Sequence, residues 1–314
     1  MILTITLNPS MDYVYRRDTF VLGEHNRFEN PHKMPGGKGI NAARAISFLG
    51  GDVICFTTLA GLNGEHIKTM LDSEKFTYIN HEINGESRNA ITVMHDGAKQ
   101  TEIVEAGPEL STKEEKEIFD QIDLILNNNS YKVVTINGSV NSRNDSLYLN
   151  LLKKIKNEHP DIFLLMDVSG QQLKNIVNSK DIHPYFIKPN IVEFSELVNK
   201  EFADKDELIH FLKTFDTNIN LLLISCGEHG AVVKYKDNIY NVEIPEVKVV
   251  NPTGSGDSTV AGVAYAIDND YDFESMIKLA MASGMSNAME KGVGVVNKEV
   301  VSELIKKISV DLIV

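Results

Sequence analysis

The sequence predicts an α/β fold with a mostly parallel central sheet that carries helices on both faces. From residue 131 onward, short apolar runs alternate with stretches of helical periodicity, as in YKVVTING, FLLMD, YFIKP and LLLISCG. Such alternation is typical of parallel strands joined by crossover helices. A chain of 314 residues with 42% hydrophobic residues can also build one large core. Because no repeat or Pro/Gly-rich linker divides it, we expect a single domain over residues 1–314.

The first expected strand covers residues 2–7, where apolar and β-branched residues precede Asn8-Pro9. Proline should end this strand and leave Asp12 just past its tip. Ligands of parallel sheets bind at the carboxyl ends of the strands. Asp12 is therefore a candidate binding residue, although a lone loop carboxylate is the more common case.

Two stretches outside the alternating pattern predict a separate small sheet. Residues 13–34 and 78–104 lack helical periodicity and mix aromatic or β-branched residues with polar ones. The second stretch contains NAITVMHDGAKQTEIV, which predicts a hairpin about Asp96-Gly97. We expect these strands to lie outside the main sheet.

A glycine-rich turn over residues 36–39 leads into an expected helix. From Ala42, apolar residues recur at i, i+3, i+4 and i+7, and Gly50 is placed to end the helix. Lys38 and Asn41 stand at the entrance, where a tight turn with a solvated lysine is the plain structural alternative. GxxxxGK[ST] is absent and no GxGxxG follows a strand, so P-loop and dinucleotide-binding folds are disfavoured.

A second glycine-rich turn lies in residues 251–267, NPTGSGDSTVAGVAYAI. We expect a strand-like run over residues 247–250 to turn here into a helix that begins near Asp257. The backbone N–H groups of residues 254–256 (Gly254, Ser255, Gly256) can converge on an anion, and the helix dipole favours negative charge there. Asp257 is then either an ordinary capping carboxylate or the general base of a phosphoryl transfer to a hydroxyl.

The two glycine-rich turns carry a family resemblance. Residues 251–257 match (D/N)-(T/P)-x-G-(A/S)-G-D, and residues 36–41 form a second motif in the expected order. The sequence therefore resembles the PfkB, or ribokinase-like, family of sugar kinases over essentially the whole chain. The resemblance implies a ribokinase-like fold, ATP as phosphoryl donor, Mg²⁺, Asp257 as general base, and a β-sheet lid formed by insertions at about 13–34 and 78–104.

The resemblance also implies roles for residues near the expected strand ends. The substrate-binding residues would be Asp12, Arg27, Gly36, Gly37, Lys38, Asn41, Arg88 and Ser139. The nucleotide-binding residues would be Lys188, Asn190, Ser225, Gly227, Gly230 and Asn287, with Glu193 organising Mg²⁺ through water. Simpler alternatives are a helix capping box for Asn190 and Glu193, and a hairpin turn for SCGEHG.

The substrate class follows from the neighbourhood of Arg88. GESRNAITV, QTEIVEAGPEL and DVSG at residues 167–170 resemble the subgroup of tagatose-6-phosphate and fructose-1-phosphate kinases. A phosphorylated sugar needs cations, which Lys38, Arg88 and Arg27 can supply. Tagatose 6-phosphate is the expected substrate and fructose 1-phosphate the alternative. The subgroup's Leu-Pro after Gly138-Ser139 is replaced here by Val140-Asn141, which leaves the choice of hexose phosphate open.

Composition excludes several partners. The formal charge of −13 and the pI near 5.2 disfavour nucleic acids and anionic membranes. No apolar stretch approaches 18 residues, and Cys55 and Cys226 lie in apolar runs, so we expect a cytoplasmic protein with buried thiols.

A nicotinamide-dependent oxidoreductase would need a glycine fingerprint after the first strand. A non-catalytic metabolite-binding regulator would be favoured only if Asp257 or its glycines were missing.

The lid predicts self-association. Its apolar residues would give a small sheet two faces, one over the sugar and one that soluble proteins cover. A second lid is the simplest cover, so we expect a possible two-fold homodimer. The residues concerned are Tyr13, Val14, Tyr15, Phe20, Val21, Ile91, Val93, Ile103 and Val104.

Overall fold

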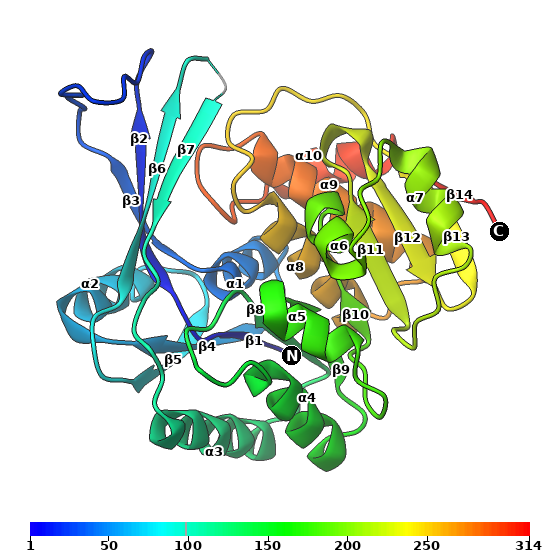
Figure 1. Ribbon diagram of the computed structural model, residues 1–314, viewed down its shortest axis with the longest axis horizontal. Helices are drawn as coiled ribbons and strands as arrows, with labels where there is room; N and C mark the ends of the chain where they lie inside the picture. Colours follow the sequence, from blue (N-terminus) through cyan, green and yellow to red (C-terminus); the bar gives the residue numbers. More distant parts are fainter. Residues whose placement is uncertain (98) are drawn as a thin grey trace.

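The computed structural model describes residues 1–97 and 99–314, so residue 98, within the expected 78–104 insertion, lies outside the described residues. A ten-stranded sheet has the order β14-β13-β12-β11-β10-β9-β8-β1-β4-β5 (Figure 1). In this order, every pair of neighbours from β11 across to β5 is parallel. Strands β12, β13 and β14 extend the β11 side in antiparallel fashion. This arrangement confirms the predicted α/β class. The strands are β1 (Ile2–Thr6), β4 (Val53–Leu59), β5 (Thr77–Glu82), β8 (Val133–Asn137), β9 (Phe163–Asp167), β10 (Phe186–Ile187), β11 (Leu221–Ser225), β12 (Ala231–Tyr235), β13 (Asn238–Glu243) and β14 (Ser309–Leu312).

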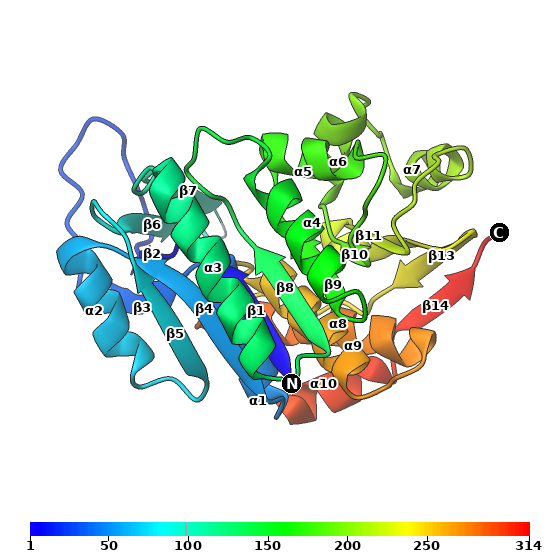
Figure 2. The same cartoon turned by 90° about the horizontal axis from the view of Figure 1, so that it is seen from below.

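Helices cover both faces of this sheet because successive strand residues point to opposite sides. Ile2 packs into one buried cluster, and Leu3 packs into the other. The first cluster includes α1 (Lys38–Phe48), α2 (Gly61–Leu71), α8 (Ser255–Asp268), α9 (Phe273–Ala288) and α10 (Lys298–Ile305). The second includes α3 (Thr112–Asn128), α4 (Leu147–Glu158), α5 (Gly170–Val177), α6 (Ile191–Val198) and α7 (Lys205–Leu212). Figure 2 shows α3 and α4 on one side of the strands and α9 and α10 on the other.

The central helix α8 is buried over most of its length and packs closely on α9. A Cβ at Gly262 would lie 2.6 Å from the Ala280 Cα, so only glycine allows this close approach. The first turn of α8 is thereby held at the carboxyl-terminal side of the sheet, next to the ends of β8 and β9. The predicted helix over residues 42–49 is also confirmed, and Gly50 follows it with a φ of 80°.

The predicted separate sheet has the strand order β3-β2-β6-β7 and stands apart from the large sheet (Figure 1). Its strands are β2 (Ser10–Arg16), β3 (His32–Gly36), β6 (Arg88–His95) and β7 (Lys99–Val104). The predicted hairpin joins β6 to β7, with positive φ at both Asp96 and Gly97. Residues 78–82, which the sequence analysis assigned to the lid, instead belong to β5 at the edge of the large sheet. An edge strand and a lid strand are both half-exposed, so their sequence patterns are alike.

The expected strand over residues 247–250 is wrong. Residues 244–250 form irregular backbone between β13 and α8. Both edges of β13, the strand that precedes this segment, are already paired with β12 and β14, so the segment cannot pair beside β13. Its apolar side chains line a cavity instead, as described below.

Across residues 1–97 and 99–314, no helix combines the length and apolarity that crossing a bilayer requires.

Candidate active site

The glycine-rich turn before α8 is held by one buried side chain, Asn287. Its Nδ2 donates to the Thr253 carbonyl at 2.8 Å and to Ser255 Oγ at 3.2 Å, and its Oδ1 accepts from Gly294 N at 2.7 Å. Gly254 has a φ of 80°, and a Cβ there would overlap Val293. Because Asn287 is 0% exposed, it shapes the turn from behind and does not line the nearby cavity, in contrast to the predicted nucleotide contact.

Asp257 lies in the first turn of α8 and is only 7% exposed. Burial raises its pKa to about 6, with the Lys38 charge opposing and the Asp167 charge adding to the increase. The Asn41 Nδ2 donates to Asp257 Oδ2 at 2.8 Å and favours the ionised form. A carboxylate with a pKa near 6 is mostly ionised at neutral pH yet basic enough to accept a proton, which suits a general base.

Two lysines converge on Asp167 at the end of β9. Asp167 Oδ1 accepts from Lys38 Nζ at 3.2 Å and lies 3.7 Å from Lys188 Nζ. Burial alone would raise the pKa of Asp167, but Lys188 and Lys38 bring it below its usual value. A Cβ at Gly256 would lie 2.9 Å from Lys188 Nζ, so this cation borders the glycine-rich turn. The pair therefore places positive charge where a transferred phosphoryl group would lie.

Asp167 was missed as a site residue, since DVSG served only as a family indicator. The available signal was its position at the end of the predicted strand FLLMD, where parallel sheets place their ligand-binding groups.

The other side of the site is built by the small sheet. Ser10 Oγ donates to Asp12 Oδ1 at 2.6 Å, and Arg88 Nε donates to the Asn8 carbonyl at 3.1 Å. Burial raises the pKa of Asp12 to about 6, with Ser10 and Arg88 opposing. A Cβ at Gly36 would overlap the Asp12 carboxylate, so strand β3 can approach it only with glycine there.

The turn into α1 completes this side. Gly37 is the N-cap of α1 with a φ of 116°, and a Cβ there would lie 3.1 Å from the Pro9 Cα. Ser139 follows β8, and its Oγ lies 3.5 Å from Asn8 Nδ2. Asn8 therefore connects Ser139 to Arg88. Predicted substrate-binding residues from β6, from the turn into α1 and from the end of β8 thus lie together.

Arg27 is not gathered with these residues. It is exposed in the loop between β2 and β3, which lies at the free end of the small sheet (Figure 1). Its backbone carbonyl accepts from Arg17 Nη1 at 2.7 Å. Within the described residues, its side chain contacts no other predicted site residue.

A cavity of about 580 Å³ opens on the other side of the α8 turn. Its polar edge includes the predicted Ser225, Gly227, Gly230, Ser255 and Gly256. Its apolar wall comes from residues 244–252 and α9: Ile244, Val247, Val249, Met281, Met285 and Ala288. An apolar cavity that ends at a glycine-rich anion site has the chemistry to hold a nucleotide base with its phosphates.

Asn190 and Glu193 form the capping box considered in the sequence analysis. The Asn190 side chain accepts from Glu193 N at 2.9 Å, and Glu193 Oε2 accepts from Asn190 N at 2.8 Å. The negative charge of Glu193 contributes, after those of Asp167 and Asp257, to the raised pKa of Lys38. Asp167 Oδ2 is buried and has no hydrogen-bond partner among residues 1–97 and 99–314. These carboxylate oxygens fit the preference of Mg²⁺ for hard ligands.

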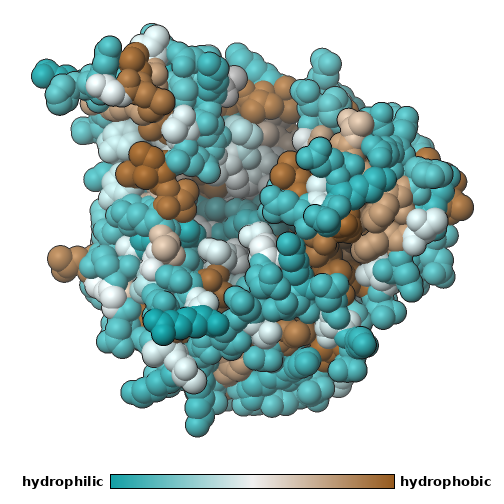
Figure 3. Space-filling view, viewed as in Figure 1, coloured by the Kyte–Doolittle hydropathy of each residue, from teal (hydrophilic) through white to brown (hydrophobic). Residues whose placement is uncertain are grey.

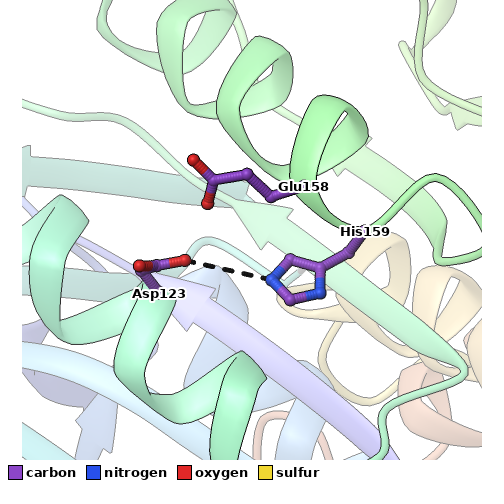
Figure 4. A group of neighbouring side chains, drawn as sticks. All are labelled: Asp123, Glu158 and His159. Atoms are coloured by element: carbon purple, nitrogen blue, oxygen red, sulfur yellow. Dashed lines mark ion pairs between the residues drawn. The ribbon is translucent and has the colours of Figure 1, made fainter.

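A second polar cluster lies on α3 and α4 and consists of Asp123, Glu158 and His159 (Figure 4). His159 Nε2 is 3.9 Å from Asp123 Oδ1. Lys154 Nζ pairs with Glu158 at 2.9 Å and with Asp123 at 3.7 Å, so a lysine ammonium already interacts with both carboxylates. We therefore assign this cluster to helix–helix attachment.

Comparisons with known proteins agree with this geometry. The model of the pfkB family of carbohydrate kinases matches residues 5–299. Tagatose-6-phosphate kinases from two strains of Staphylococcus epidermidis are 37% identical over 313 residues, which cover 99% of this chain and 99% of each relative. The crystal structure of phosphofructokinase-2 from Escherichia coli in complex with potassium aligns with a TM-score of 0.86 at 25% identity, covering 97% of this chain and 98% of that one. A possible 1-phosphofructokinase from Thermotoga maritima aligns with a TM-score of 0.89 at 20% identity, covering 100% and 99%.

Proposed function

Because this chain belongs to the pfkB family of carbohydrate kinases and is an ATP-dependent sugar-phosphate kinase, we propose that it phosphorylates tagatose 6-phosphate to tagatose 1,6-bisphosphate. The observation that carries the proposal is the buried Asp257, which lies between the cavity on one side and Asp12 and Arg88 on the other. Similarity to tagatose-6-phosphate kinases over 99% of the chain supports this acceptor. Fructose 1-phosphate is the alternative acceptor, because both substrates present a phosphate and a free hydroxyl.

In the proposed reaction, the acceptor hydroxyl gives its proton to Asp257 while its oxygen forms a bond to the γ-phosphorus. The bond from that phosphorus to the bridging oxygen breaks, and ADP leaves with the electron pair. The N–H groups of residues 254–256, Lys38 and Lys188 stabilise the charge on the transferred group. Asp12 would bind sugar hydroxyls, and Arg88 would bind the phosphate that the sugar already carries.

Mg²⁺ fits this site through Glu193, whose carboxylate would organise it by way of water. When bound, the ion would neutralise charge between the nucleotide phosphates. A cytoplasmic location is also proposed, and it is supported by the free, buried Cys55 and Cys226.

The acceptor is tested by ATP consumption with tagatose 6-phosphate, fructose 1-phosphate, fructose 6-phosphate, ribose and fructose. We expect the highest kcat/KM for tagatose 6-phosphate and negligible turnover of the unphosphorylated sugars. A higher kcat/KM for fructose 1-phosphate would establish the alternative. Preference for ribose would contradict a phosphate-binding role for Arg88.

The nucleotide role of the cavity is tested at Val249, which lines it and is 56% exposed. Val249→Glu should raise the KM for ATP about tenfold, because a base bound against this apolar wall would strip water from the carboxylate. The KM for the sugar phosphate should stay within twofold. Val314 is 55% exposed outside the cavity lining, so Val314→Glu is the matched control. Equal KM values for the two variants would place ATP elsewhere.

The small sheet is proposed to act as a lid. Gln100 Nε2 lies 3.3 Å from Thr253 Oγ1, so strand β7 reaches the glycine-rich turn. Figure 3 shows hydrophobic residues at the surface of the small sheet and a hollow between it and the larger body. A lid over this hollow would exclude water from the γ-phosphate and limit ATP hydrolysis.

The lid is also proposed to form a two-fold homodimer. Val14 and Val93 are only 7% and 4% exposed within one chain, so they do not supply the outer apolar face expected from the sequence. Ile103 and Val104 on edge strand β7 do, at 56% and 53% exposed. Sedimentation should give a wild-type dimer and a monomer for Ile103→Asp with Val104→Asp. Leu62→Asp, at a residue 84% exposed on α2, is the control and should remain dimeric. An active wild-type monomer at micromolar concentration would refute the dimer.

A further inference from the structure

Arg44 on α1 is a buried cation without a role in the mechanism above. It is 3% exposed, and its guanidinium makes five hydrogen bonds. Nε and Nη2 donate to Glu74 Oε1 at 2.8 and 2.7 Å, and Nη2 also donates to the Pro35 carbonyl at 2.8 Å. Nη1 donates to Asn41 Oδ1 at 3.0 Å and to the Val293 carbonyl at 2.8 Å.

The bond to Asn41 determines which way its amide points. A guanidinium has only donors, so it fixes the accepting Oδ1 of Asn41 toward itself. The donating Nδ2 is then left to face Asp257 Oδ2, at 2.8 Å. In the flipped amide, two oxygens would face each other at Asp257 and two donors would meet at Arg44. The flipped arrangement is therefore disfavoured at both ends.

We propose that Arg44 is a positioning residue for phosphoryl transfer, which locks the Asn41 amide so that it donates to the general base Asp257. This inference rests on the proposed role of Asp257. The hydrogen bond from Arg44 to the Val293 carbonyl supports this positioning role. Val293 is the residue that confines Gly254, and Gly294 N donates to Asn287, the side chain that holds the same turn. Arg44 therefore aligns the base and braces the turn that carries it.

A purely structural role makes a different prediction. Arg44 would then serve only to tie α1 to residues 72–76 through the ion pair with Glu74. In that case Glu74→Gln should reproduce the effects of Arg44→Met. If Arg44 acts through Asn41, Glu74→Gln keeps the bond to Asn41 and should leave kcat and its pH dependence within about twofold of wild type.

The experiment is a double-mutant cycle of Arg44→Met and Asn41→Ala, followed in kcat and in the pH profile of kcat. Arg44→Met should lower kcat about 10–100-fold, the range seen for coupled residues of one network. It should also move the acid limb of the profile up by about one pH unit, because the carboxylate loses a hydrogen bond that favours its charged form. Lys38, Lys188 and Asp167, which also act on Asp257, are the same in every variant. Burial raises the pKa of Asp12 to about 6 and the Arg44 charge opposes it, so Asn41→Ala, which keeps that charge, should show the same shift of the acid limb as Arg44→Met. The double variant should be no slower than Asn41→Ala alone.

Three outcomes would overturn the inference: additive losses in the cycle, an unshifted acid limb in Arg44→Met, or equal losses in Glu74→Gln. Should Arg44→Met unfold, the double variant Arg44→Met with Glu74→Gln removes both charges of the ion pair. Its kcat and acid limb then show whether loss of the bond to Asn41 affects the base. Failure of the proposed function is distinct. A wild type that phosphorylates no sugar phosphate refutes that function, whereas an active wild type with a normal Arg44→Met refutes only the positioning role.

Discussion

Asp257→Asn should lower kcat by about 10²–10⁴-fold, the usual loss when a positioned general base is removed. An amide can still accept from Asn41 Nδ2 but cannot take the hydroxyl proton at neutral pH. The KM values for ATP and sugar phosphate should change far less, because the surrounding cations and glycines remain. Steady-state kinetics with both substrates varied will measure this. Retention of more than half of the wild-type kcat would show that another group is the base.

A folding defect cannot explain a loss of kcat in Asp257→Asn, because this substitution is expected to keep or raise the free energy of unfolding. The folded-state pKa of Asp257, about 6, is above the ordinary 3.8, so protonation favours the folded state. The stability that the protonated group contributes is fully present below pH 3.8 and is lost as pH rises through 6. At pH 7.5 the ionised carboxylate therefore destabilises the fold, and Asp257→Asn should have a Tm at or above that of wild type.

Asp268→Asn is the matched control at the other end of α8. Asp268 Oδ1 pairs with the amino terminus at 2.9 Å and is remote from the transfer site. This variant should lose stability and keep kcat, the reverse of Asp257→Asn.

Lys38→Met should lower kcat/KM for the sugar phosphate by about 10–150-fold, the range of a charge-assisted hydrogen bond of about 1.5–3 kcal/mol. Lys38 is also the strongest attraction that opposes the raised pKa of Asp257. Its removal should therefore shift the acid limb of kcat to higher pH. The KM for ATP should change little. Lys113→Met, at a lysine 84% exposed on α3, is the control and should match wild type. A raised KM for ATP would indicate a nucleotide-binding role, and a lowered Tm would indicate a folding defect.

Much of the fold and the transfer site could be predicted because their signals are local. The turns at residues 36–39 and 254–256 are marked by clustered glycines, and each leads into a periodic helix. The groups that exclude a Cβ there, such as Asp12 at Gly36 and Val293 at Gly254, are distant in sequence. The strand over residues 2–7 was likewise limited by Asn8-Pro9. These predictions depend on backbone geometry that the sequence states directly.

The errors concern pairing between distant segments. Residues 78–82 have the alternation of any half-exposed strand, and only their pairing with β4 places them in the large sheet. The run at 247–250 is apolar because Val247 and Val249 line a cavity, and it pairs with no strand of the described residues. Val14 and Val93 were expected on the outer lid face because alternation alone does not say which face is covered.

Three residues of the candidate site have contacts that the sequence did not reveal, because their partners lie far along the chain. Asn287 was expected at the nucleotide, yet its bonds to Thr253, Ser255 and Gly294 turn it inward. Arg44 in a helical run is indistinguishable from a surface arginine until Glu74 and Val293 close over it. Asp167 gains its importance only when Lys38 and Lys188 meet it. Tertiary contacts determine all three roles.

The sugar-side residues Asp12, Arg88 and Gly36 come from three strands of the small sheet, whereas Asp257 and the cavity belong to the large body. The proposed acceptor contacts are thus divided between two parts of the architecture, because Lys38 and Ser139 belong to the large body. The chain enters and leaves the small sheet at only a few crossings, such as Asn8-Pro9. If the proposed roles hold, a small sheet grafted from another sugar kinase should change the acceptor preference only together with Lys38 and its neighbours on α1, whereas the cavity beside α8 should stay intact.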